Sequence, residues 1–181
     1  MIFLGICSYC SLFVPNFSIL KCPLCDIKHT RSLSASSHIT WIPEVENSFV
    51  NLKKALQTTP TLGVPNPDKP FVQCVNEKEE WLTSALLQKH GCHLKPVAYF
   101  SSTLDPVAKA LLHCLSAVWA AEKAVLASRN FVGFSDLTFL ILHAVSALLE
   151  EQKTSHLSAV CCLGYHTILL PHVTVKKCNT F

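Results

Sequence analysis

A proline-rich run at residues 58–70 divides the sequence into two parts. The run reads TTPTLGVPNPDKP and contains four prolines and one glycine. Proline lacks the N–H that a helix or an inner strand needs, and it holds the residue before it in an extended conformation. We therefore predict an extended linker at residues 59–69, a helical segment at 1–58 before it, and a second domain at 70–178 after it.

The part before the linker predicts a small helical segment. In the run WIPEVENSFVNLKKALQ, four apolar residues recur at spacings of four, three and four, namely Val45, Phe49, Leu52 and Leu56. This spacing places them on one face of a helix. The stretch 1–20 is apolar but is broken by a Val-Pro-Asn sequence at 14–16, and the polar, serine-rich stretch 26–40 is typical of a loop.

The part after the linker predicts a mixed sheet with helices on its faces. Strand-like runs stand at 71–75, 95–102, 137–142 and 172–175, and helical patterns begin at Asp105-Pro106 and at 144. The run 81–90, WLTSALLQKH, is compatible with either a strand or a helix, because Ala, Leu and Gln are weak strand formers. Three early strands followed by a helical crossover favour an α/β domain.

Composition limits the functional classes. Charged residues make up 15% of the chain, compared with about 25% in average soluble domains, so the chain is expected to pack against other protein surfaces. The formal net charge of +3 does not by itself indicate a nucleic-acid partner.

The first 20 residues contain no charged side chain, which argues against a secretory signal and, given Pro15 and Asn16, against a membrane span. The ten cysteines are then expected to be reduced thiols of an intracellular chain, if the reading frame is expressed.

Several runs, taken in order, resemble one family. The run LKKALQTTPTLGVPNPDKPFVQCVNEKEEWLTSALLQK resembles the segment that joins the thumb to the connection domain of retroviral reverse transcriptases. KPVAYFSSTLDPVAKALLHCLSAVWAAEKAVL and LILHAVSALLE are similar to its continuation in gammaretroviral-type enzymes, and FLGICSYCSLFVPNFS is similar to the thumb. The resemblance covers nearly the whole chain and suggests a fragment of an endogenous retroviral pol reading frame.

The resemblance implies a ribonuclease H-like fold, with a five-stranded mixed sheet and flanking helices, preceded by a thumb remnant. Ribonuclease H cleavage needs several carboxylates that converge on divalent metal ions. By motif, the three acid positions fall at Asn76, Cys114 and Leu142, none of which is a carboxylate. Glu77 is adjacent to Asn76, but neighbouring residues of a strand face opposite ways. We therefore expect no catalytic residue, no resident cofactor and no cleavage, although the parent family uses magnesium.

The N-terminal cysteines leave a second reading open. Cys7, Cys10, Cys22 and Cys25 form two C-x2-C pairs, a spacing typical of zinc sites. The eleven residues between the pairs are mostly apolar, whereas zinc-binding loops are usually polar, and the thumb resemblance implies no metal. A small zinc-binding protein remains the alternative function, and incidental thiols on a buried helix are the simpler interpretation.

The remaining histidines and cysteines are expected to have structural roles, whereas four lysines are candidates for binding. Histidines 29, 38, 90 and 93 are expected to be solvated, His113 half-buried, and His143 a cap; the adjacent Cys161 and Cys162 point apart. Lys53, Lys54, Lys89 and Lys95 are candidates for contact with a phosphate backbone.

The resulting hypothesis is a non-catalytic module. Its ancestral partners would be an RNA–DNA hybrid and the rest of the polymerase. The sequence suggests neither a membrane nor a small-molecule substrate.

Overall fold

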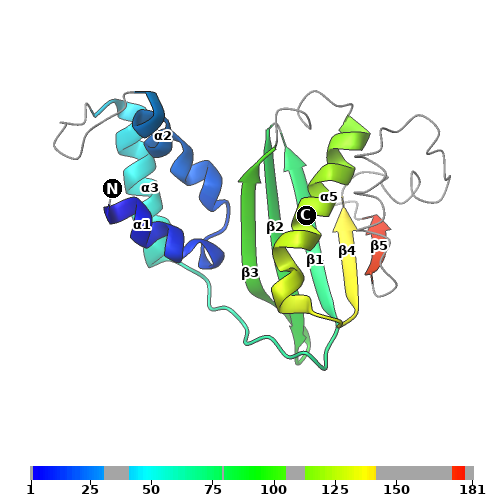
Figure 1. Cartoon of the computed structure of the whole chain (residues 1–181). Helices are drawn as coiled ribbons and strands as arrows, with labels where there is room; N and C mark the ends of the chain where they lie inside the picture. The colour runs from blue at the N-terminus through cyan, green and yellow to red at the C-terminus, as the bar shows by residue number, and fades with distance from the viewer. Residues whose placement is uncertain (1, 31–40, 79, 105–112, 142–172, 178–181) are drawn as a thin grey trace.

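A computed structural model of the chain describes residues 2–30, 41–78, 80–104, 113–141 and 173–177. These residues form a group of helices beside a five-stranded sheet, and the two are joined by an extended run (Figure 1). Within the described part, no helix is long and apolar enough to cross a membrane. The predicted division at residues 58, 69 and 178 fits this layout but remains a prediction.

The helical segment is built around a short apolar core. It consists of α1 (Ile2–Tyr9), the 3-10 turn η1 (Ser11–Phe13), α2 (Phe17–Thr30) and α3 (Pro43–Gln57). Leu52 of α3 is buried against Cys7, Val14 and Phe17, with Leu56 at the edge of the same cluster. The expected break at 14–16 is present, and Asn16 adopts a left-handed φ of 55° there. Residues 26–30 of the predicted loop are helical, because α2 continues to Thr30, and residues 31–40 lie outside the described part.

The sheet has the strand order β3-β2-β1-β4-β5. Its strands are β1 (Phe71–Lys78), β2 (Trp81–His90), β3 (His93–Thr103), β4 (Leu137–Ile141) and β5 (Val173–Lys177). The first three strands pair antiparallel, whereas β4 pairs parallel with β1 and β5 pairs parallel with β4. The predicted mixed, five-stranded α/β sheet is therefore confirmed, and 81–90 is a strand rather than a helix.

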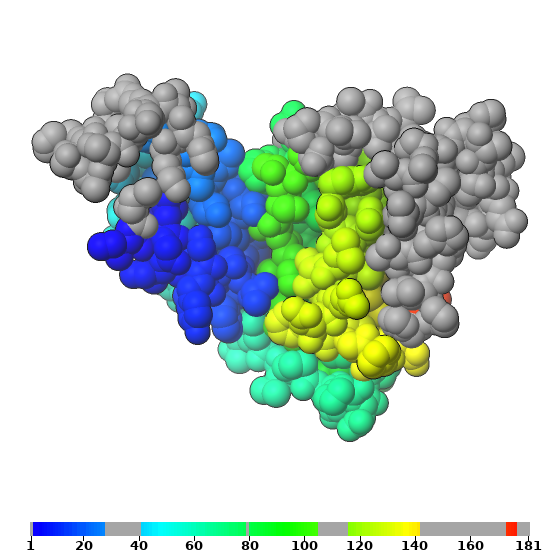
Figure 2. Space-filling view, viewed as in Figure 1, coloured from blue at the N-terminus to red at the C-terminus, as the bar shows by residue number. Residues whose placement is uncertain are grey.

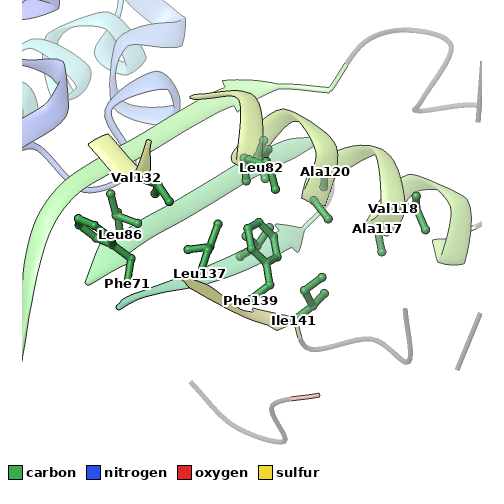
Figure 3. Packing of buried hydrophobic residues seen from close by; sticks show 14 of the residues in the cluster. Phe71, Leu82, Leu86, Ala117, Val118, Ala120, Val132, Leu137, Phe139 and Ile141 are labelled. Atoms are coloured by element: carbon green, nitrogen blue, oxygen red, sulfur yellow. The ribbon is translucent and has the colours of Figure 1, made fainter. Parts of the chain in front are cut away.

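The helix α5 (His113–Val132) packs across one face of this sheet (Figure 1). Alanines at 117, 120, 121 and 124 are almost completely buried against it, and their small side chains let the helix approach the strands closely. Figure 3 shows Phe71, Leu137 and Phe139 of the strands beneath the helix. Burial of this apolar surface is the main source of the domain's stability.

The described part of α5 begins after the predicted helix start at 105–106, which lies outside the described residues, as does the predicted helix that begins at 144. The helix stops at Val132. Gly133 then takes a φ of 58° and donates its N–H to the Arg129 carbonyl at 2.9 Å. A left-handed glycine directly after a helix is a common way to satisfy its last carbonyls.

A buried polar network ties α5 to the sheet. Gln73 is fully buried on β1, and its Nε2 donates to Ser84 Oγ and to the Ala124 carbonyl, both at 2.9 Å. Ser128 Oγ donates to Gln73 Oε1 at 2.8 Å. Because all three side chains find partners, the network fixes the position of the helix at little desolvation cost.

Candidate functional site

The first candidate acid position lies on the sheet face that points away from α5. Asn76 is opposite Thr83 in the antiparallel register of β1 and β2, and both line a cavity on that face. Directly opposed residues share a face of the sheet. Glu77 is opposite Leu82, which is buried in the core beneath α5. The structure therefore places Glu77, and not Asn76, on the face that α5 covers.

The other two candidate positions are less fully defined. Cys114 lies in the first turn of α5, and its side chain is outside the described part of the structure. Leu142 follows β4 and is also outside it. The structure thus does not bring Asn76 to the helix that carries Cys114. Sequence reasoning could have found the orientation of Glu77 from the alternation of buried Phe71, Gln73 and Val75.

The four N-terminal cysteines lie on two different helices or their ends. Cys7 is buried, whereas Cys10, Cys22 and Cys25 are partly exposed. Burial, with a smaller contribution from the nearby Cys10 thiol, raises the pKa of Cys7 and so disfavours the thiolate that binds metal. Across the described ranges, no group of three or more His, Cys, Asp or Glu residues is placed to hold a metal ion.

The four candidate lysines do not form one patch. Lys53 and Lys54 are exposed on α3, and Lys53 Nζ lies 5.4 Å from the centroid of the Phe49 ring. Lys89 and Lys95 lie on the hairpin of β2 and β3, where Lys89 is opposite Leu94 and Lys95 is opposite Gln88. Because adjacent pairs of a ladder face opposite ways, these two lysines lie on opposite faces of the hairpin.

The histidines are split between described and undescribed regions. His90 was expected to be solvated, but its ring contacts the protein. Its Nδ1 lies 3.1 Å from the Gln88 carbonyl oxygen and its Nε2 lies 3.3 Å from the Val64 carbonyl oxygen. His93 is exposed, as predicted. For His29 and His113 only the helical backbone is described. His38, His143 and the Cys161–Cys162 pair lie outside the described residues.

The linker is hydrogen-bonded along the β2–β3 hairpin. Gly63 donates its N–H to the Pro96 carbonyl at 2.7 Å. The buried Gln88 side chain accepts from the Asn66 N–H at 2.8 Å and donates to the Asn66 and Lys69 carbonyls. These contacts anchor the end of the linker to the sheet domain.

The helical segment meets the sheet at the edge strand β3. Ser18 N–H donates to Ser101 Oγ at 2.8 Å, and Ser18 Oγ donates to the Ser101 carbonyl at 2.6 Å. Figure 2 shows the N-terminal part (blue) against this edge (green). The cavity lined by Asn76 lies at the same junction, beneath the turn at Pro15 and Asn16.

Comparison with known proteins identifies the family. Residues 41–138, more than half of the chain, match the family described as the RNase H-like domain found in reverse transcriptase. The chain belongs to this family. The family resemblance inferred from the sequence is thereby confirmed, and the matched range runs from α3 through β1, β2, β3 and α5 to the start of β4.

Curated relatives are retroviral polyproteins. The chain is 32% identical over 168 residues to the Pol polyprotein of feline endogenous virus ECE1, covering 93% of this chain and 16% of the relative. It is 34% identical over 168 residues to the Gag-Pol polyprotein of feline leukemia virus, covering 93% of this chain and 10% of the relative. The chain thus spans less than a fifth of each, and it is similar to a fragment of retroviral Pol.

Solved structures of foamy viral protease-reverse transcriptase share the fold. One in complex with double-stranded DNA aligns with a TM-score of 0.82 at 19% identity, covering 98% of this chain and 31% of that chain. One in complex with an RNA/DNA hybrid has a TM-score of 0.77 at 19% identity, covering 99% and 24%. The native prototype foamy virus enzyme has a TM-score of 0.60 at 15% identity, covering 99% and 24%.

Proposed function

We propose that this chain is a non-catalytic spacer module of a reverse transcriptase, and that it contacts the sugar-phosphate backbone of a template–primer duplex. The observation that carries the proposal concerns the sheet face that α5 covers: β1 places Glu77 there, but the sequence from 106 to 121, which leads into α5, contains no Asp or Glu. The boundaries proposed for its parts are 1–58 for the thumb-derived helices, 59–69 for the linker and 70–178 for the RNase H-like domain.

The residues present do not fit the pair of divalent metal ions used by active ribonucleases H. Such a site needs converging carboxylates, because oxygen ligands hold magnesium and balance its charge. Glu77 stands at that end of β1 and Glu79 and Glu80 follow it in the sequence, but from Pro106 to Ala121 the sequence contains no Asp or Glu. Without an acid from the helix opposite β1, the carboxylates do not converge as a two-metal centre needs, so no cleavage step is assigned to this chain.

Support for a duplex partner comes from the superposition on solved structures. The foamy viral complexes with DNA and with an RNA/DNA hybrid align with TM-scores of 0.82 and 0.77. The native foamy virus enzyme aligns with a TM-score of 0.60 at nearly the same coverage. At nearly equal coverage, a lower score means a poorer overall superposition. This chain as a whole therefore superposes better on the duplex complexes than on the native enzyme.

Lys53 and Lys54 are proposed as backbone contacts because they are adjacent, exposed and on one helix. The small net charge predicts weak binding that falls steeply with salt. The test is fluorescence anisotropy of a labelled RNA–DNA hybrid with the full chain at low and at physiological salt. We expect saturable low-salt binding that Lys53→Ala/Lys54→Ala weakens several-fold and that the control Lys123→Ala on α5 leaves intact. Absence of low-salt binding would refute the duplex contact.

The same samples test the lack of catalysis. Incubation of the hybrid with magnesium or manganese should leave the RNA strand intact over hours. Cleavage that disappears in Glu77→Gln would show that the domain is an enzyme and that Glu77 takes part. Cleavage that persists in this variant would instead indicate a contaminating nuclease, and would be checked with a separately purified preparation.

No resident cofactor is proposed, and the zinc alternative has its own test. The buried Cys7 thiol would have to become a thiolate within the helical core, where burial disfavours the charged form. Titration of the reduced chain with cobalt(II) should give no tetrahedral absorption spectrum. A spectrum of four-thiolate type that is lost when Cys22 and Cys25 are replaced by Ser would establish the metal site.

A further inference from the structure

The junction between the helical segment and the sheet forms a cavity that the proposed function does not use. It has a volume of about 160 Å³ and is an open hollow rather than an enclosed one. Its lining comes from two regions that are distant in sequence. The turn at Pro15 and Asn16 forms one wall. Strands β1, β2 and β3 form the rest, with Asn76, Ala85 and Tyr99 respectively among their lining residues.

The volume matches one six-membered ring. An apolar cavity of about 150 Å³ in a protein interior is known to take up benzene. Pro15, Cys74 and Ala85 provide apolar surface here, which favours the faces of a ring. The open side lets a ligand enter without unfolding either part.

The chemistry of the lining selects a neutral ligand. Within the described residues, no lysine, arginine, aspartate, glutamate or histidine lines the cavity. A phosphate or carboxylate would lose its hydration there without gaining a countercharge, which is costly. The amides of Asn16 and Asn76 and the hydroxyl of Thr83 can donate and accept hydrogen bonds. Burial also raises the pKa of Tyr99, which keeps its hydroxyl neutral.

We propose that this cavity is a binding site for a small neutral aromatic compound, one six-membered ring with a hydrogen-bonding substituent. Because the lining residues come from both parts of the chain, a bound ring bridges them. Occupancy therefore fastens the helical segment to β3 and strengthens the contact between Ser18 and Ser101. The inference rests on the cavity alone and is independent of nucleic-acid binding.

The first test compares two probes of the same shape, benzamide and benzoate, with the full chain. Saturation-transfer difference NMR should show saturable binding of benzamide with a Kd on the order of a millimolar or tighter, as expected for a ligand of this size. Benzoate should bind at least tenfold more weakly, because of its charge. Equal binding of both probes, or no saturable benzamide binding below about 10 mM, overturns the site.

Two substitutions locate the binding. Ala85→Leu fills the cavity and should abolish benzamide binding. Thr138→Leu adds similar volume on the same sheet face of β4, outside the lining, and should leave it unchanged. Circular dichroism checks that both variants fold. If Ala85→Leu does not fold, Asn16→Gly replaces it, since glycine keeps the left-handed φ and removes only the amide. Wild-type affinity in the folded cavity variant refutes the assignment.

The bridging effect has a separate readout. The Ser18 amide hydrogen is bonded to Ser101 Oγ, so its exchange with solvent reports the opening of the junction. Saturating benzamide should slow this exchange in the wild-type chain and not in the cavity-filled variant. Unchanged exchange at saturation would show that the ring binds without bridging the two parts.

Discussion

Ser18 and Ser101, 83 positions apart in the sequence, bind each other through two hydrogen bonds. One joins the Ser18 amide to the Ser101 hydroxyl, and the other joins the Ser18 hydroxyl to the Ser101 carbonyl. Together they align the start of α2 with the edge of the sheet. The pair is a direct polar link between the helical segment and β3.

Replacing Ser101 by alanine should weaken this link. The Ser18 amide loses its acceptor in a partly buried position, and we expect a loss of about 1 kcal/mol in the free energy of unfolding. Urea denaturation of the full chain measures it. The matched control is Ser102→Ala, an exposed neighbour on the same strand, which should change the stability by less than about 0.5 kcal/mol. Equal effects of the two substitutions would contradict the role of the pair.

The network around Gln73 should behave as one unit. Gln73→Ala removes a fully buried side chain and the hydrogen bond that it donates to Ser84, so a loss of about 3 kcal/mol is expected. Ser128→Ala should cost about 1–2 kcal/mol. The double variant should lose less than the sum, because the two side chains share a hydrogen bond. Strict additivity in a double-mutant cycle would show that they act independently.

The closeness of Gly63 to His90 makes another prediction. A Cβ atom at position 63 would stand 2.7 Å from His90 Cε1, so Gly63→Ala must push the imidazole away from the linker. We expect overpacking to lower the free energy of unfolding by about 1 kcal/mol. Adding His90→Ala to the Gly63→Ala variant should relieve most of this steric clash.

The control for this prediction is Gly5→Ala in α1, where an added Cβ meets nothing within 4 Å. That change should stabilise the chain by roughly 0.5–1 kcal/mol, because alanine is the better helix former. Thermal unfolding compares the two. A destabilised Gly5 variant, or a neutral Gly63 variant, would be inconsistent with these contacts.

Tyr99 should make stability depend on alkaline pH. Burial raises the pKa of its hydroxyl in the folded chain, so the unfolded chain ionises first as the pH rises. The stabilisation is complete below about pH 10 and is lost as the pH climbs through the raised pKa of the folded state. Tyr99→Phe removes this loss. The difference in unfolding free energy between wild type and variant should therefore change between about pH 9 and pH 11, and a constant difference would contradict it.

The predictable part of the fold is the part with regular spacing. The stripe of Val45, Phe49, Leu52 and Leu56 predicted α3, and the short apolar runs predicted β1, β3 and β4. The family and the mixed sheet followed from the order of these elements. The strand β2 could not be settled, because its conformation is imposed by pairing with strands on both sides and not by its own residues.

The features that the sequence did not reveal are tertiary. From the sequence alone, a glutamine such as Gln73 or Gln88 would be placed on the surface. Its burial is explained only by hydrogen-bond partners that are distant in the sequence. The cavity likewise needs residue 16 beside residues 74–85 and 99. The sheet face on which Glu77 lies could have been predicted from the sequence. It follows from the alternation of side chains along a strand once one buried residue is known.

The strand β3 stands at the border of the sheet, where unpaired main-chain groups can recruit a strand from another molecule. Here the Pro96 carbonyl is taken by Gly63 and the Ser101 carbonyl by Ser18, while proline itself offers no N–H. The residues that precede the sheet thus shield its border at two points. A version of the domain cut within the linker would expose this border, and it should self-associate into β-rich aggregates where the full chain does not.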